Sequence, residues 1–250
     1  MTELDPRLKK LEIKLEASIK KSKPEEDLMT DGTILNLWPQ HSLKEVLNNS
    51  SFYKKSIFQP ITMTQDQFID SSKIKNVPQE IINKLVLVNV DYRGFDNQVY
   101  QGQIVIHKDL ESSIRRIFKR ILTDTNFPIT SVFPISMFNW HSSSRCNNSG
   151  AFDWRFVLNN REISDHSFGA AIDINPVLNP WVQEGSPVNF PYFPHDKNKR
   201  GTLHANSDVV KIFKEEGWKW GGDWEKSKDW MHFYRPEIPF KYYGKIEAIE

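Results

Sequence analysis

The pattern of apolar and polar positions first predicts regular structure in the middle of the chain. Residues 84–95 (KLVLVNVDYRGF) have the composition and alternation of a β-strand. After a run of turn-forming residues, residues 100–110 are a second strand candidate. Residues 110–124 instead carry apolar side chains at helical spacing. We therefore expect the order strand, strand, helix. The helix would bury Ile114, Ile117, Phe118 and Ile121.

The second half of the chain contains two further predicted elements. Residues 169–175 (GAAIDIN) are typical of a short strand with alternating faces. Within residues 207–220, the pattern predicts a helix that begins at Ser207, a good N-cap residue, and ends at Gly217, a good helix stop.

The N-terminal part of the chain has a different character. Residues 6–22 predict an amphipathic helix. Its polar face mixes both charge signs and carries no aromatic residue, so we expect it to pack on the protein or on a partner helix rather than on a membrane. The polar sequence that follows predicts an irregular extension. We expect an N-terminal extension over residues 1–60, of unknown role, and a main domain over residues 61–250.

Charge and cysteine content exclude several classes of function. The 250 residues carry 33 Lys+Arg and 32 Asp+Glu, so the chain lacks the basic surplus with which nucleic-acid binders neutralise phosphates. Cys146 is the only cysteine, which excludes an intramolecular disulfide and a thiolate-rich zinc finger. No apolar run approaches the ~20 residues needed to span a bilayer. We expect no nucleic-acid partner and no membrane span.

Cellular location follows less directly from the sequence. The charged N-terminus lacks the apolar core of a secretory signal peptide. We therefore expect a protein that is cytoplasmic, that is released by lysis, or whose export signal is absent from this sequence.

The stretch SDHSFGAAIDINP, residues 164–176, contains the first candidate site residues. In a strand, alternation places Asp173 and Asn175 on one face and Ile172 and Ile174 on the opposite face, toward the core. Gly169 allows a bend or the close approach of another backbone. His166 and Asp173 are then either a buried histidine and a turn aspartate, or two ligands of a metal site.

A third metal ligand would come from residues 217–234, where Asp229 and His232 are three positions apart. Two histidines and one carboxylate suit zinc and leave a fourth position for water, on which Asp229 would act as general base. Spacing alone leaves other readings open, because most lone histidines are structural and His195 and His204 compete as ligands. The tryptophans of this segment are most simply core or cleft-wall residues: Trp218, Trp220, Trp224 and Trp230.

Together, in this order, the two motifs resemble a known family. Residues 164–173 have the form S-x-H-x-x-G-x-A-x-D, and WGGDW…KDWMHF (220–233) is a tryptophan-glycine stretch followed by acid-x-x-His. Both are similar to the M15 zinc peptidases, the D,D-carboxypeptidases and L-alanyl-D-glutamate endopeptidases of bacterial cell walls and phage endolysins. The segment NNSGAFDWR (147–155) resembles an Asn-rich segment of one branch. The resemblance covers residues 85–236.

The resemblance implies roles for individual residues. His166, Asp173 and His232 would bind one zinc ion, and Asp229 would be the catalytic base and acid. Ser164 would lie near the substrate or support His166.

Two further assignments follow from the same resemblance. Arg155 would stabilise the oxyanion that forms as the scissile carbonyl becomes tetrahedral. In the alternative interpretation, Arg155 forms a structural salt bridge, and Arg145 or Arg161 stabilises the oxyanion instead. Asp223 would be a supporting or substrate-binding residue near the site.

The family also implies a fold and an activity. The fold would be α+β, with a small antiparallel sheet that carries the zinc site on one face and is flanked by helices, as in hedgehog and D,D-peptidase domains. Residues 61–250 would form the zinc peptidase domain. The implied activity is hydrolysis of peptidoglycan stem peptides or muropeptides by metal-activated water, as a carboxypeptidase or an endopeptidase. We expect a monomer.

Other functions stay open on the sequence. A zinc-bearing binding or signalling module of the same fold would keep the ligands without hydrolysis, and the acid at Asp229 favours the enzyme. The N-terminal extension would in another reading inhibit the site or recruit a partner. The chain departs from the family pattern at Asp229, where many relatives have Glu, and at Trp154, where relatives often have Cys.

Overall fold

The computed structural model describes residues 63–69, 77–137, 143–144, 147–157, 162–183 and 194–240. The predicted helix at residues 6–22 lies outside these ranges, and the domain boundary near residue 60 stays a prediction. The described part of the chain mixes helices with small sheets, in agreement with the expected α+β class. None of its helices is long and apolar enough to cross a membrane.

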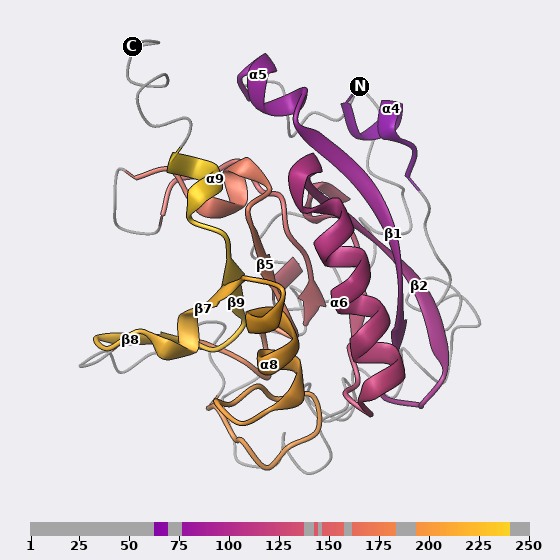
Figure 1. The fold of residues 1–250 in the computed structure, drawn as a ribbon, viewed down its shortest axis with the longest axis vertical. Coiled ribbons are helices and arrows are strands. Elements are labelled where there is room, and N and C mark those ends of the chain that lie inside the picture. The colour runs from indigo at the N-terminus through magenta and orange to yellow at the C-terminus, as the bar shows by residue number, and fades with distance from the viewer. Residues whose placement is uncertain are drawn as a thin grey trace, which may run out of the picture.

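A long hairpin and one helix form the first half of the described structure (Figure 1). β1 (Leu85–Arg93) pairs in antiparallel register with β2 (Val99–His107). α6 (Glu111–Asp124) packs against β1, and all four apolar side chains predicted at helical spacing are buried. The predicted order of strand, strand and helix is confirmed.

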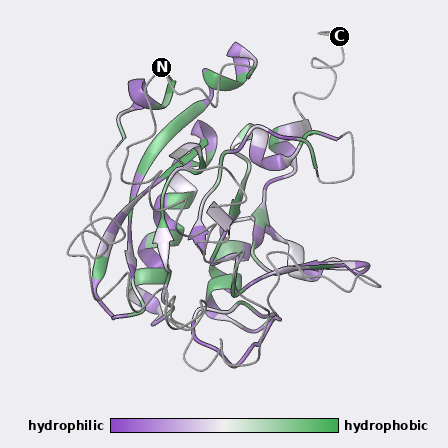
Figure 2. Ribbon diagram, turned by 180° about the vertical axis from the view of Figure 1, so that it is seen from behind, coloured by the Kyte–Doolittle hydropathy of each residue, from purple (hydrophilic) through white to green (hydrophobic). Residues whose placement is uncertain are grey.

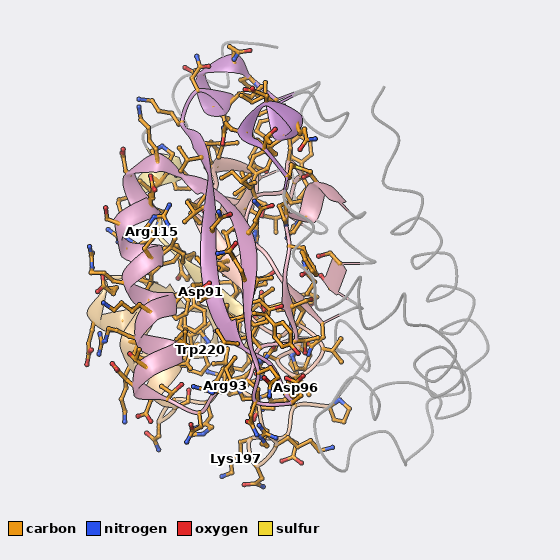
Figure 3. All side chains as sticks on the ribbon, turned by 90° about the vertical axis from the view of Figure 1, so that its right-hand side faces the viewer. Asp91, Arg93, Asp96, Arg115, Lys197 and Trp220 are labelled. Carbon is orange, nitrogen blue, oxygen red and sulfur yellow. The ribbon has the colours of Figure 1, made fainter. Side chains whose placement is uncertain are left out.

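Polar contacts tie the helix to the hairpin. The Arg115 guanidinium of α6 donates to the Asn89 carbonyl oxygen at 3.1 Å, and Arg93 of β1 donates to the Leu122 carbonyl oxygen at 3.3 Å. Figure 3 labels both arginines, which lie at different heights along the helix and the hairpin. Figure 2 shows β1 changing from apolar green near its start to purple further along, as its sequence dictates.

A three-stranded antiparallel sheet occupies the second half, in the order β5-β9-β7. Its strands are β5 (Ala171–Asp173), β9 (His232–Tyr234) and β7 (Lys219–Trp220). α8 (Asp208–Glu215) packs against it, and the ring of Phe213 stacks on Phe233 with centroids 3.8 Å apart. This small sheet carries two of the predicted site residues.

The helix predicted to begin at Ser207 and to end at Gly217 is confirmed. α8 begins directly after Ser207, and Gly217 takes a φ of +84° just after the helix ends at Glu215. Beyond Gly217 the chain enters the sheet, where Trp220 pairs with Phe233.

The other elements are short. β6 and β8 form an antiparallel pair, and β3 and β4 form a separate two-residue parallel pair. The bounds are α4 (Gln65–Ile69), α5 (Gln79–Ile82), η3 (Lys108–Leu110), β3 (Ser131–Val132), η4 (Ile135–Met137), β4 (Asn148–Ser149), η5 (Asp165–Phe168), β6 (Trp181–Gln183), η6 (Gly221–Asp223), β8 (Ser227–Asp229) and α9 (Glu237–Phe240).

Asn175 does not share the cleft face with Asp173, contrary to the alternation argument. β5 ends at Asp173, and Asn175 is buried with a φ of +45°. Its Oδ1 accepts the Thr130 N–H at 3.0 Å, and its Nδ2 donates to the carbonyl oxygens of Pro128 and Gly201. A buried amide must find such partners, so Asn175 serves to hold the loop between α6 and β3 and the loop at Gly201 against the end of β5.

Candidate active site

η5 and β5 bring His166 and Asp173 to one pocket. The Ser164 hydroxyl caps η5 and accepts the His166 backbone N–H at 3.4 Å. Gly169 follows η5 with a φ of +62°, and a Cβ there would lie 2.6 Å from the His107 backbone nitrogen. Only glycine allows this turn and this close approach, as the sequence predicted.

The turn between β8 and β9 supplies Asp229 and His232. β8 ends at Asp229 and β9 begins at His232. In the sheet register Asp173 lies directly opposite His232, and Trp181 of β6 lies opposite Asp229. Strand pairing therefore brings together side chains that are distant in the sequence.

Three potential ligand atoms form a nearly equilateral triangle. His166 Nε2 lies 3.3 Å from Asp173 Oδ1, His232 Nδ1 lies 3.1 Å from the same oxygen, and the two nitrogens are 3.3 Å apart. Ligands at ordinary zinc distances in a tetrahedral site lie roughly 3.3–3.4 Å from one another. The triangle thus fits a metal ion, and it is the one such group of His, Cys, Asp and Glu within the described ranges.

A backbone contact orients the first imidazole. His166 Nδ1 lies 2.5 Å from the Ala151 carbonyl oxygen, which can only accept, so Nδ1 carries the proton. Nε2 then presents its lone pair to the centre of the triangle. A second imidazole nitrogen that donates to a carbonyl is the usual arrangement of a metal-binding histidine.

The charges of the site favour a cation. Burial alone would raise the pKa of the Asp173 carboxyl, but His166 and His232 lower that pKa well below its usual range. Burial opposes a charge on His232, yet its hydrogen bond to Asp173 and the nearby Asp229 carboxylate raise its pKa overall. Both shifts mean that positive charge is stabilised at the triangle, where a metal ion would supply it.

Asp229 lies beside the triangle on the wall of the same pocket. Its Oδ1 is buried and has no hydrogen-bond partner among the described residues. Burial is the main cause that raises the pKa of Asp229 to about 7; the charge of Asp173 adds to it, and His232 and Arg155 oppose it. A carboxylate with a free oxygen and a pKa near neutrality is suited to proton transfer.

Arg155 forms a salt bridge, the first of its two expected roles, and it lies at the pocket, where its catalytic role stays a prediction. Its guanidinium forms an ion pair with Asp153, with Nε 3.2 Å from Oδ2, and it also lines the pocket. Its backbone N–H donates to the Ser167 hydroxyl at 2.9 Å, which fixes this segment against η5. Arg145 and Arg161 lie outside the described residues.

The pocket that holds these groups has a volume of about 320 Å³. Half-buried Trp181 and Trp224 form part of its wall, so Trp224 is a cleft residue, one of the two places proposed for it. Trp181 and Asp165 also line the pocket, and the sequence analysis missed both. Asp165 adjoins the candidate ligand His166 in sequence, which was the only signal available for it.

Other predicted residues lie elsewhere. Asp223 is half-exposed, forms an ion pair with Lys214 at 2.7 Å and does not line the pocket. His195 Nε2 contacts the Leu203 carbonyl oxygen at 2.8 Å, and its ring stacks on Trp230. These contacts give Asp223 and His195 structural partners and separate them from the ligand triangle.

Two glycines allow η6 to pack against the β8–β9 turn. A Cβ on Gly221 would lie 2.6 Å from the Asp229 carbonyl oxygen, 2.8 Å from the Asp229 Cβ and 3.3 Å from the His232 Cβ. A Cβ on Gly222 would lie 2.3 Å from the Trp220 ring. Gly221 therefore sets how closely η6 approaches the candidate base.

Comparison with known proteins agrees with this site. Residues 158–235, which contain the ligand triangle and Asp229, match the M15 peptidase family model described as D-alanyl-D-alanine carboxypeptidase. No solved structure matches the chain. The match supports a peptidase, and the family is typically metal-dependent. The resemblance expected from the two sequence motifs is confirmed: residues 158–235 match the model of the M15 peptidase family, and this match supports membership of that family.

Proposed function

We propose that this protein is a zinc-dependent peptidase that hydrolyses the peptide stems of bacterial peptidoglycan. The observation that carries the proposal is a ligand triangle that shares one pocket with Asp229, whose Oδ1 has no hydrogen-bond partner among the described residues. A binding module needs the ligands but has no use for Asp229, whose buried oxygen costs free energy while it lacks a partner. The position of the site on β5 and β9 supports a hedgehog-like or D,D-peptidase-like arrangement.

Zinc is the ion that we propose for the triangle. His166, Asp173 and His232 would hold it through two imidazole nitrogens and one carboxylate oxygen, a set that suits tetrahedral zinc and leaves one position open. When bound, the ion supplies Lewis acidity, which lowers the pKa of a water molecule and polarises the substrate carbonyl.

Asp229 would move the proton. Its free oxygen accepts a proton from the attacking water as the new bond to the carbonyl carbon forms. The same carboxyl then gives this proton to the amide nitrogen as the C–N bond breaks. The products are one carboxylate and one amine, and Asp229 returns to its ionised form.

Arg155 would stabilise the negative charge that develops on the carbonyl oxygen. Its ion pair with Asp153 holds the guanidinium at the pocket wall, so the charge is in place before the substrate arrives. Ser164 supports the site through the cap that holds the backbone of η5.

The activity should depend on pH through Asp229, which must be ionised to accept a proton. Burial raises its pKa to about 7, whereas Arg155 and a bound dication favour the ionised form. We expect kcat/KM to fall as the pH drops below 7, over a range in which the metal content stays constant.

Arg155→Met should change this pH profile. It removes a cation that lowers the pKa of Asp229, so the acid limb should move to higher pH and the plateau rate should fall. A variant with an unmoved limb and an unchanged plateau would exclude Arg155 from the reaction.

Gly221 should be needed for the position of the base. In Gly221→Ala the new Cβ would meet Asp229 at 2.6–2.8 Å, so the β8–β9 turn must shift. A misplacement near 1 Å can cost roughly 100-fold in rate. Gly102→Ala is the matched control, because its Cβ would meet Val132 at 2.5 Å, away from the pocket. Equal turnover per folded molecule in the two variants would contradict this role of Gly221.

Mass spectrometry of purified peptidoglycan and of soluble muropeptides, with and without a zinc chelator, tests the function and names the bond. Chelator-sensitive loss of one alanine would identify a carboxypeptidase. Release of whole stems would identify L-Ala–D-Glu cleavage. Intact substrates after incubation with zinc-loaded protein would contradict the proposal.

A further inference from the structure

Asp165 is a carboxylate of the pocket to which the proposed mechanism assigns no role. It opens η5, one residue before the ligand His166, and it lines the pocket. The other aspartates of the pocket have roles: Asp173 belongs to the ligand triangle and Asp229 is the proposed base. Asp165 is half-buried, so its charge loses part of its hydration.

No cationic side chain compensates Asp165 within the described part of the chain. Its carboxylate forms no hydrogen bond or ion pair there, and the charges that act on it are those of His232, His166 and Glu162. When a metal is bound, the two histidines become neutral ligands, and the charge of the ion is offset by its ligand Asp173 and by Asp229 in the same pocket. The exposed Glu162 is another anion and makes the surroundings of Asp165 more negative.

The pocket lining contains a single described cation to balance these charges, Arg155, and it forms an ion pair with Asp153. A substrate group that approaches Asp165 therefore meets a partly desolvated negative charge. A carboxylate would be repelled there. An ammonium group would gain a charge-assisted hydrogen bond and would compensate the buried anion.

We propose that Asp165 forms a subsite for a primary ammonium group of the peptide substrate, beside the bond that is cleaved. The inference rests on the proposed peptidase function and narrows its substrate class to amine-bearing peptides. Two sources share this chemistry: the free N-terminus of a short peptide, and the side-chain amine of a diamino residue. Asp165 is thus a specificity-determining residue and takes no part in bond cleavage.

Four forms of one synthetic stem peptide with a lysine residue test the proposal. Both amines are free in the first form, the N-terminal amine is acetylated in the second, the side-chain amine in the third, and both in the fourth. Acetylation removes the charge that Asp165 would bind. For zinc-loaded protein we expect acetylation of the recognised amine to lower kcat/KM roughly 10- to 100-fold, mainly by raising KM. The form that suffers this loss identifies the source of the amine.

The preference is the ratio of kcat/KM for the free-amine peptide to kcat/KM for the acetylated peptide. Asp165→Asn should bring this ratio close to one, because the side chain keeps its shape but loses its charge. This ratio is internal to each variant, so a general loss of activity does not affect it. Asp223→Asn is the matched control, because it removes a carboxylate from the surface ion pair with Lys214 and should keep the preference.

The outcomes separate the two proposals. Equal kcat/KM for all four forms in the wild-type protein would overturn the ammonium subsite and leave the peptidase intact. Full preference for the free amine in Asp165→Asn would also overturn it. Absence of cleavage for every form would contradict the peptidase itself, and the subsite with it.

Discussion

Replacement of Asp229 by alanine should lower kcat by roughly 10²- to 10⁴-fold, the usual contribution of a general base, while zinc stays bound. The reason is that the ligand triangle is built from His166, Asp173 and His232, and Asp229 is not one of its atoms. Turnover of a chromogenic or mass-resolved peptide, together with metal analysis of the same sample, measures both effects.

Two further variants make this result specific. Asp229→Asn keeps the size of the side chain but cannot accept the proton, so it should be about as slow as the alanine variant. Asp223→Asn removes a surface carboxylate paired with Lys214 and should turn over normally. Near-normal rates in either Asp229 variant would mean that another group moves the proton.

Loss of a ligand should have the second large effect. His166→Ala and His232→Ala each remove one corner of the triangle, so neither variant should retain stoichiometric zinc, and hydrolysis should fall to background. Zinc binding should also stabilise the wild-type fold, but not the fold of either ligand variant. The expected gain is about 2.7 kcal/mol when free zinc is a hundred times its Kd.

His204→Ala is the matched control for the ligand variants. His204 competed as a ligand on composition, but its hydrogen bonds with the Ser207 hydroxyl are made by its backbone, and it lies outside the triangle. Its variant should keep one zinc per chain and the zinc-dependent rise in Tm. Full zinc content in His166→Ala or His232→Ala would overturn the ligand assignment.

Local sequence patterns predicted the larger elements because each buries one face. β1, β2 and α6 follow the periodicity of their apolar residues, since those residues line a common core. The ligand pair of His166 and Asp173 was also visible, as the glycine and small residues between them allow a turn into a strand.

Long-range contacts could not be predicted in this way. The register that places Asp173 opposite His232 depends on the pairing of β5 with β9, which no local spacing encodes. Asn175 follows a buried hydrogen-bond network instead of strand alternation. Trp181 sits in a strand of three residues, too short for a periodic signal, so its place on the pocket wall emerged only from the fold.

Reconstitution with zinc tests the central claim most directly. The metal-free protein is titrated with zinc while bound metal and the rate of stem-peptide hydrolysis are measured in the same samples. The account predicts that hydrolysis rises in proportion to bound zinc and reaches its plateau at one ion per chain, and that Asp229→Ala binds the same single ion without recovering activity. Hydrolysis by the metal-free protein, or a fully zinc-loaded wild-type protein that cleaves no stem peptide, would contradict it.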